Sequence, residues 1–325
     1  MTNQKMFMFR KKAGNVLMAL FRYVLLISLG FVILTPIFST IKESITAQHA
    51  LGMKNSVWIP SAVSMQSLLE GYYMMNYGKG LAFSIFNTAL IAVLQTASAA
   101  FAAYSFARLK FKGSGLLFGV VIFTIIVPPQ SIMLTQYMAF HDFDILGLFN
   151  LITGSPVNLI GNQLSIYLLA FSGVGIKGGL YIYLLRQAFR GFPISIEEAA
   201  YVDGAGFVRT FATVVLPGVS STLLTVGVLS FVWNYADTYF IGLLSSTSLH
   251  LAIRLGQVTT NVRWALMDIE SKMPTKYIMQ WDSPYVQTAV ATACALLTIA
   301  PLLVMYAFVQ KRFVEGVSRS GLGGD

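Results

Sequence analysis

Apolar stretches, separated by shorter polar segments, make up most of the sequence. The six longest cover residues 23–41, 81–107, 115–138, 164–189, 217–235 and 285–310. An α-helix needs about 20 apolar residues to cross the hydrocarbon core of a bilayer. Backbone polar groups inside a bilayer must be satisfied within the segment, which favours helices over open sheets. The pattern therefore predicts an all-α, polytopic membrane protein with six transmembrane helices in a domain of residues 23–310.

Prolines and glycines interrupt some of these stretches. Pro128 and Pro129 are adjacent in the third stretch, so we expect a kink near its outer half. Glycines predict a bend in the fourth stretch at Gly173, Gly175, Gly178 and Gly179. The charge-free region 145–161 is expected to form an outer re-entrant or interfacial segment. The polar region 245–281 is expected to be a long outer loop.

Composition agrees with a membrane protein. Of 325 residues, 56% are hydrophobic and only 11% are charged, less than half the usual charged share of a soluble domain. The single cysteine, Cys294, excludes a disulfide framework, and its apolar surroundings indicate a buried packing residue. The net charge of +9 could suggest nucleic acid as a partner. The basic residues instead flank apolar runs, which is typical of membrane topology, so no nucleic-acid partner is expected.

The distribution of basic residues predicts the topology. Lys and Arg are concentrated before the first stretch, after the second, around the end of the fourth and after the sixth. By the positive-inside rule these segments face the cytosol. The prediction is an even number of spans with both termini inside. Residues 1–22 then form a cytosolic N-terminal segment and residues 311–325 a cytosolic tail.

A polar island, residues 195–217, separates the fourth and fifth stretches. Pro193 ends the preceding helix because it lacks a backbone donor. Ser195 and Glu198 have the S-x-x-E spacing of a capping box, which predicts a helix start. Glu197 and Glu198 suit the first helical turn, where acidic side chains meet the positive end of the helix dipole.

The second half of the island predicts a turn and another helix. Asp203, Gly204 and Gly206 favour a turn, because glycine adopts backbone angles that other residues resist. A short helix is expected through residues 208–215, and Pro217 suits the first position of the next helix. A helix, turn and helix between two spans is more elaborate than a connection requires, which indicates a docking surface.

Motifs for catalysis or nucleotide binding are missing from the sequence. It contains no G-x-x-x-x-G-K-[ST], no H-E-x-x-H and no G-x-S-x-G. His141, Asp142 and Asp144 could in principle hold a metal, but a fourth ligand is lacking, so a solvated loop is the preferred interpretation. We therefore expect no catalytic residue, no metal site and no enzymatic activity in this chain.

The polar island resembles the coupling motif of importer permeases of the ATP-binding-cassette superfamily. That motif is E-A-A, three residues, G, nine residues, then an aliphatic residue, one residue and L-P. Here it reads Glu198, Ala199, Ala200, Gly204, Val214, Leu216 and Pro217, with Val in place of the more usual Ile. Residues 231–234 also resemble the end of the fifth span of sugar permeases. In that family an Asp commonly follows the Asn directly, whereas here the next acidic residue is Asp237. Residues 311–325 resemble the tail of the maltose-type permease subunit.

The resemblance implies an importer-permease (type I) fold and a permease subunit of a carbohydrate importer in a bacterial cell membrane. It implies as partners a second unlike permease subunit, two ATPase subunits, an external sugar-binding receptor and membrane lipid. ATP and Mg would be bound by the ATPase, leaving no cofactor in this chain. The residues expected to couple to the ATPase are Glu197, Glu198, Ala199, Ala200, Asp203, Gly204, Leu216 and Pro217, with Glu198 reaching a basic group on that subunit.

Polar residues at membrane depth are the candidates for the pathway: Lys177, Asn234 and Asp237. Lys177 precedes the basic boundary at Arg190 by enough residues to lie roughly 20 Å above it, at about 1.5 Å per residue. A charge at that depth is costly. Either Lys177 extends to the outer headgroups, or it faces the interior, where it could pair with Asp237 or meet an anionic sugar.

Two other functions are compatible with the pattern. The chain could be the permease of an importer for another solute class, since the sequence does not name the sugar. It could also be an ion-coupled secondary transporter, which would need ionisable residues within its spans. Only Lys177 and Asp237 meet that requirement, and no inverted repeat is apparent.

Overall fold

The structure is a computed structural model that describes residues 2–52, 58–245, 249–273 and 280–317. Within these ranges the chain is helical, and its β features are two isolated bridges, Thr46 with Val63 and Phe143 with Val157. The all-α fold class is therefore confirmed. The chain divides into two compact units. Unit 1 is Met1–Met74 with Val258–Leu297, and unit 2 is Met75–Gln257 with Thr298–Asp325.

Unit 1 contains the long N-terminal helix α1 (Thr2–Ile45), the short helix η1 (Gln48–Ala50), α2 (Gln66–Met74), α15 (Val262–Ile269) and η3 (Glu270–Lys272). Here α2 packs against α15. Glu70 on α2 is fully buried and accepts hydrogen bonds at 2.9 Å from the Nε2 atoms of Gln48 and Gln66. These bonds satisfy a buried carboxylate that would otherwise be costly. They also tie α2 to the segment that follows α1.

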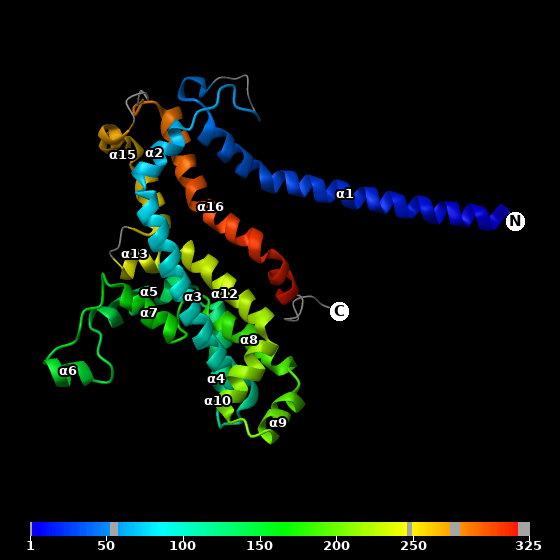
Figure 1. Cartoon of the computed structure of the whole chain (residues 1–325), viewed down its shortest axis with the longest axis vertical. Coiled ribbons are helices and arrows are strands. Elements are labelled where there is room, and N and C mark those ends of the chain that lie inside the picture. Colours follow the sequence, from blue (N-terminus) through cyan, green and yellow to red (C-terminus); the bar gives the residue numbers. More distant parts are fainter. Residues whose placement is uncertain (1, 53–57, 246–248, 274–279, 318–325) are drawn as a thin grey trace. The chain divides into compact units, whose positions relative to one another are not determined.

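The core of unit 2 is built around α3 (Tyr77–Arg108), which packs against α7 (Gln163–Phe171), α8 (Gly178–Gly191) and α12 (Ser220–Tyr235) (Figure 1). Small side chains at Ala99 and Ala103 of α3 are fully buried in a cluster with Tyr181 and Phe189 of α8. Small residues let two helix backbones approach closely, which is how helices associate where lipid removes the hydrophobic driving force. This core carries the site described below.

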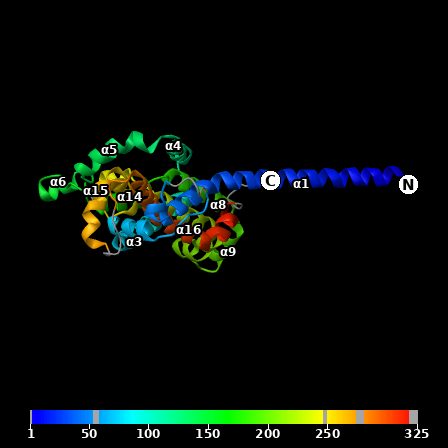
Figure 2. The ribbon, with the colours of Figure 1, turned by 90° about the horizontal axis from the view of Figure 1, so that it is seen from above.

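Prolines divide the third apolar stretch into two helices. Helix α4 (Ser114–Ile126) and helix α5 (Pro129–His141) are bent by 108° (Figure 2). Val127 and Pro128 both have extended backbones, as expected of a residue before proline and of a proline that precedes a helix. The position of the predicted kink agrees with this break, but the bend is far larger than a kink in one continuous span. The short helix α6 (Leu148–Thr153) follows.

Glycines divide the fourth stretch as well. Helices α7 and α8 are separated by six residues, with left-handed backbones at Gly173 (φ 76°) and Lys177 (φ 60°). A Cβ at Gly178 would collide with the carbonyl of Gly173. The predicted bend is therefore a full interruption of the helix.

The remaining helices complete the chain. After α8 come α9 (Ile194–Val202), α10 (Phe207–Thr210), the π-helical turn η2 (Phe211–Val215), α11 (Leu216–Gly218) and α12. The pair Phe207–Gly218 and Ser220–Tyr235 is bent by 80°. Beyond α12 lie α13 (Phe240–Leu244), α14 (Leu251–Thr260) and the long α16 (Pro284–Val317), which passes through Pro301. The expected loop 245–281 was wrong in that α14 and α15 occupy much of it.

The number of spans is bounded by the helices of the described ranges. Three of them are long and apolar enough to cross a membrane: Gly14–Ile45, Tyr77–Arg108 and Pro284–Lys311. Counting each bent pair as one span raises the number to five. The split between α7 and α8 leaves the fourth stretch outside this count. Six spans therefore stay a prediction.

Candidate coupling surface and pathway cavity

The predicted helix, turn and helix are present, but the first helix begins earlier than predicted. Helix α9 starts at Ile194 with Pro193 as its N-cap, and no side chain caps it. The capping box of Ser195 and Glu198 was therefore wrong. Proline has no N–H to satisfy and a fixed φ, so it can precede a helix without a side-chain cap. Glu197 then lies in the first turn, as predicted.

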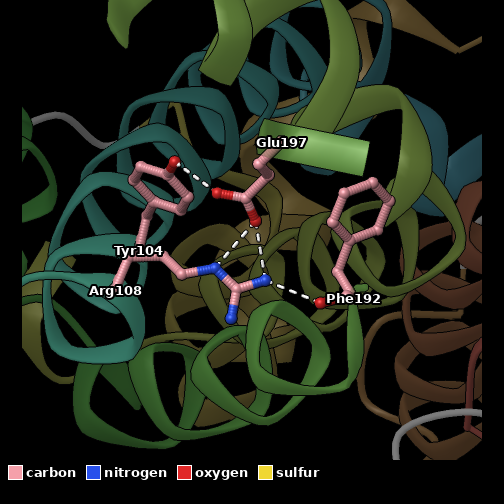
Figure 3. A network of polar contacts seen from close by, with 4 residues as sticks. All are labelled: Tyr104, Arg108, Phe192 and Glu197. Carbon is pink, nitrogen blue, oxygen red and sulfur yellow. Dashed lines mark hydrogen bonds and ion pairs between the residues drawn. The ribbon is translucent and has the colours of Figure 1, made fainter. Parts of the chain in front are cut away.

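Glu197 is the buried member of the acidic pair. The Nε atom of Arg108, the last residue of α3, donates to Oε1 of Glu197 at 2.7 Å, and the Tyr104 hydroxyl donates to Oε2 at 3.0 Å (Figure 3). Arg108 also donates from a terminal nitrogen to the carbonyl of Phe192 at 2.7 Å. The side chains of Arg108 and Glu197 are only 12% and 5% exposed. This charge-assisted network fastens α9 to the end of α3.

Aromatic side chains surround this network. The Tyr104 ring lies 5.4 Å from the ring of Phe189 on α8, 5.6 Å from that of Phe207 on α10 and 4.7 Å from that of Phe211 in η2. Phe189 and Phe211 are buried. The hairpin of α9 and α10 is thus held against α3 and α8 by both a polar and an apolar contact.

The opposite side of the hairpin is open. Glu198, Ala199, Asp203 and Gly204 are exposed and Ala200 is partly buried. Two valines extend the open side as an apolar surface, Val202 at 87% and Val208 at 75% exposure. Gly204 has φ of 82°, and the N–H of Ala205 donates to the carbonyl of Ala200 across the turn. Leu216 is partly buried and Pro217 exposed in α11. The predicted coupling residues therefore comprise one buried residue, Glu197, which anchors the hairpin, and others that are exposed or partly buried.

Arg108 and Tyr104 are site residues that sequence reasoning missed. Arg108 was interpreted only as a topological charge, and Tyr104 as part of a span. The sequence did contain a signal for this contact: a basic residue ends one predicted helix and an acidic pair begins another. It did not reveal which of the two acids would be buried.

A cavity of about 520 Å³ lies in unit 2 among α3, α4, α5, α7, α8 and the residues that follow α12. Its wall is mainly apolar, with Ile91, Ile132 and Ile166 among its residues. The three predicted pathway residues, Lys177, Asn234 and Asp237, all contribute to this wall. The structure therefore brings together residues that are far apart in the sequence.

Lys177 is directed towards α12, and its Nζ lies 4.9 Å from the centroid of the Trp233 ring. The ion pair with Asp237, one of the alternatives considered for Lys177, is not formed among the described residues. The Asp237 carboxylate instead caps the chain that leads into α13, accepting from the N–H groups of Tyr239, Phe240 and Ile241 at 2.9 to 3.3 Å. Three backbone donors next to the carboxylate satisfy it without a cation.

Asn234 belongs to a buried polar network centred on Gln95 of α3, another residue that sequence reasoning missed. The Oε1 atom of Gln95 accepts from Ser230 Oγ at 2.6 Å and from Asn234 Nδ2 at 3.1 Å. The Nε2 atom of Gln95 donates to the carbonyl of Ile176 at 2.7 Å. The network therefore holds the break between α7 and α8 against α3 and α12.

The sequence matches the family described as "Binding-protein-dependent transport system inner membrane component" over residues 95–318. That match covers well over half of the chain. The chain belongs to this family. As a member it is a multi-pass inner-membrane component of a transport system, not the ATPase. Nucleotide binding in such importers is the task of a separate subunit. An ion-coupled secondary transporter does not fit this membership.

Relatives and a solved structure agree with this family. The chain is 27% identical over 314 residues to "Maltodextrin transport system permease protein MdxG" of Bacillus subtilis, covering 93% of this chain and 95% of the relative. It is 22% identical to "Probable starch degradation products transport system permease protein AmyC" of Thermoanaerobacterium thermosulfurigenes, covering 90% of each. A solved bacterial ABC transporter "involved in the import of the acidic polysaccharide alginate" aligns with a TM-score of 0.62 at 17% identity, over 91% of this chain and 96% of the other. The importer-permease fold is thus confirmed.

Proposed function

We propose that this chain is a permease subunit of an ATP-driven carbohydrate importer in a bacterial cell membrane. The observation that carries the proposal is the hairpin of α9 and α10, which presents Glu198, Ala199, Asp203 and Gly204 outward while Glu197 anchors it. Relatives whose names refer to maltodextrin and starch products support carbohydrate as the solute class.

The hairpin acts as a lever on the transmembrane core. An ATPase that closes on ATP and Mg moves the outward face, and the buried pair of Arg108 and Glu197 passes this movement to α3. Helices α7, α8 and α12 follow because they pack on α3. In physical terms a ligand on a partner subunit biases a two-state element of this chain.

The proposed assembly contains a second unlike permease subunit, two ATPase subunits and an external sugar-binding receptor. Both termini of this chain lie in the cytosol, residues 23–310 form six spans, and the tail after residue 310 faces the ATPase. Lys177, Asn234 and Asp237 lie along this chain's half of the pathway. Membrane lipid surrounds the exposed apolar side chains of α1.

The test is copurification of the tagged chain from its native membrane, followed by transport into proteoliposomes. The expected result is an ATPase, a second permease and a receptor, with ATP hydrolysis stimulated by oligosaccharides such as maltotriose or trigalacturonate through that receptor. The alternative of another solute class is represented by amino acids and polyols in the same assay. Stimulation by those solutes alone would overturn the carbohydrate assignment and leave the permease assignment intact.

A further inference from the structure

A cation and a carboxylate line the cavity in unit 2, and an aromatic ring lies next to the cation. Lys177 Nζ lies over the Trp233 ring at 4.9 Å, and Asp237 lines the same cavity. Lys177 and Asp237 are partly buried, while Trp233 is 46% exposed. The three side chains come from the start of α8, the last turn of α12 and the segment after it.

Lys177 forms no ion pair with the described residues. Among the described residues, no Asp or Glu oxygen lies within ion-pair distance of its Nζ. Asp237, which lines the same cavity, directs both oxygens to backbone N–H groups. A lysine at bilayer depth is costly and is normally offset by a partner or marks a functional site. The ring of Trp233 offsets only part of that cost.

The backbone at Lys177 gives a second, independent sign. Its φ of 60° is left-handed, a conformation that favours glycine or asparagine over lysine. Glycines stand at 175, 178 and 179, so the chain uses them freely in this break but places a long basic side chain at the strained position. Strain retained at one residue points to a use for its side chain. The positive end of the 14-residue helix α8 begins at the same residue and also favours an anion.

The site offers more than a positive charge. The Asp237 carboxyl group can accept further hydrogen bonds, because its two oxygens have about four acceptor positions and three are used. A ligand that satisfies both ends therefore carries an anionic group for Lys177 and hydroxyl donors for Asp237. The exposed part of the Trp233 ring, which Lys177 does not cover, suits the apolar side of a sugar ring.

We propose that Lys177 binds the carboxylate of an acidic saccharide during transport, with Asp237 accepting a hydroxyl and Trp233 contacting the ring. The substrate class is then a uronate-containing oligosaccharide. This inference rests on the proposed function as a carbohydrate permease. It concerns a site within this chain and is separate from selection by the external receptor.

The experiment measures equilibrium binding of radiolabelled trigalacturonate to the copurified permease–ATPase complex without receptor. The wild-type complex is expected to bind it, and Lys177→Met to weaken binding by about tenfold to a hundredfold, the usual effect of losing a charged hydrogen bond. Lys177→Arg should keep most of the affinity. Lys177→Gly should weaken binding as Lys177→Met does while relieving the left-handed strain, so a folding defect cannot explain the loss. Lys79→Met, which removes an exposed cation at the start of α3, is the matched control.

Competition separates the sources of the anion. Unlabelled maltotriose should compete poorly, and inorganic phosphate should compete only at much higher concentration than trigalacturonate. Equal competition by maltotriose would overturn the acidic class, and equal competition by phosphate would reduce the site to a simple anion site and overturn the saccharide. Unchanged binding in Lys177→Met would overturn the role of Lys177.

Transport distinguishes this inference from the proposed function. Import of maltotriose but not of trigalacturonate, with no trigalacturonate binding, would refute the inference alone. A complex that imports no saccharide, even with its copurified receptor, would refute the proposed function itself.

Discussion

Gly204 lies in the turn of the hairpin of α9 and α10, in a backbone conformation that favours glycine. Its φ of 82° is left-handed, and an added Cβ would meet no atom within 4 Å. Gly204→Ala therefore tests backbone strain alone, whereas Gly204→Asp adds a charge to the exposed face. We expect Gly204→Ala to lose about 1 kcal/mol of stability and keep most coupled ATP hydrolysis. Gly204→Asp should lose coupled hydrolysis sharply while membrane insertion stays normal.

The measurement for these two variants is receptor-stimulated ATP hydrolysis of the purified complex, with the amount of copurified ATPase recorded in parallel. Full stimulation in Gly204→Asp would contradict a docking role for this turn. Equal loss in both variants would assign the effect to backbone strain instead of to the surface.

His250 gives a residue-scale test of burial. It lies in the connection between α13 and α14, is fully buried, and has Nε2 3.5 Å from Thr88 Oγ1. Desolvation lowers its pKa from the ordinary 6.5 to about 4. The unfolded chain therefore takes up a proton below pH 6.5 that the native state takes up only near pH 4, so stability falls as the pH falls through this window.

We expect wild-type protein in detergent to lose about 2 kcal/mol of stability between pH 7 and pH 5 through this histidine. His250→Gln should remove that share of the acid sensitivity in thermal unfolding measured at both pH values. His141→Gln is the matched control, because the side chain of His141 is 51% exposed. An identical loss of stability between pH 7 and pH 5 in wild type and His250→Gln would show that His250 is not held in its neutral form by burial.

At the scale of elements, the contact between α3 and α9 is the proposed mechanical link between the hairpin and the transmembrane core. Arg108→Met leaves the Glu197 carboxylate buried without its cation, and breaking a buried pair on one side costs about 3–5 kcal/mol. The predicted outcome is reduced stability and weak coupling. The double variant Arg108→Met with Glu197→Gln removes both charges and should recover stability.

The amount of transport per ATP hydrolysed distinguishes transmission of movement through this pair from a purely structural role. If α9 transmits movement to α3 through the pair, the stable double variant still couples ATP hydrolysis to transport less tightly than wild type. Lys112→Met is the control, since it removes an exposed cation from the loop after α3 and leaves the pair of Arg108 and Glu197 in place. Wild-type transport per ATP in the double variant would leave the pair with a purely structural role.

The elements also show what the sequence pattern could and could not predict. Apolar run length located α3 and α16 well, and Gly204 marked the turn of the hairpin, because burial and left-handed backbone leave local signals. Pro128 and Gly173 marked interruptions, but the angle of 108° between α4 and α5 depends on packing and not on local sequence. The bond between Arg108 and Glu197 joins residues 89 positions apart, and no local periodicity encodes such a pair.

Among the candidate site residues, the sequence predicted which residues line the cavity better than it predicted their hydrogen-bond partners. Lys177, Asn234 and Asp237 were selected as polar residues at membrane depth, and they do line one cavity. The ion pair that was one alternative for Asp237 is not formed, because backbone donors at the start of α13 lie closer to its carboxylate than any cation of the described residues. Gln95 was missed because one glutamine in a long apolar helix has no spacing signal of its own.

At the scale of the whole molecule, the predicted topology assigns each segment to one side of the membrane. Six spans with both termini inside place residues 145–161 and 245–281 outside, and the loop after α3 and the coupling hairpin inside. Four exposed positions sample these segments: Ser155, Trp264, Lys112 and Asp203. Each can be changed to cysteine in a Cys294→Ala background, since Cys294 is the chain's single cysteine.

A membrane-impermeant maleimide applied to intact spheroplasts is expected to label Ser155→Cys and Trp264→Cys. It should label Lys112→Cys and Asp203→Cys only after the membrane is opened, because the positive-inside rule predicts that the loop after α3 and the end of α8 lie in the cytosol. Labelling of Ser155→Cys and Asp203→Cys from the same side would mean that α7 and α8 together do not cross the bilayer. That result would reduce the number of spans and remove the fourth apolar stretch as a wall of the pathway, whereas opposite sides would make α7, the break at Lys177 and α8 one interrupted span.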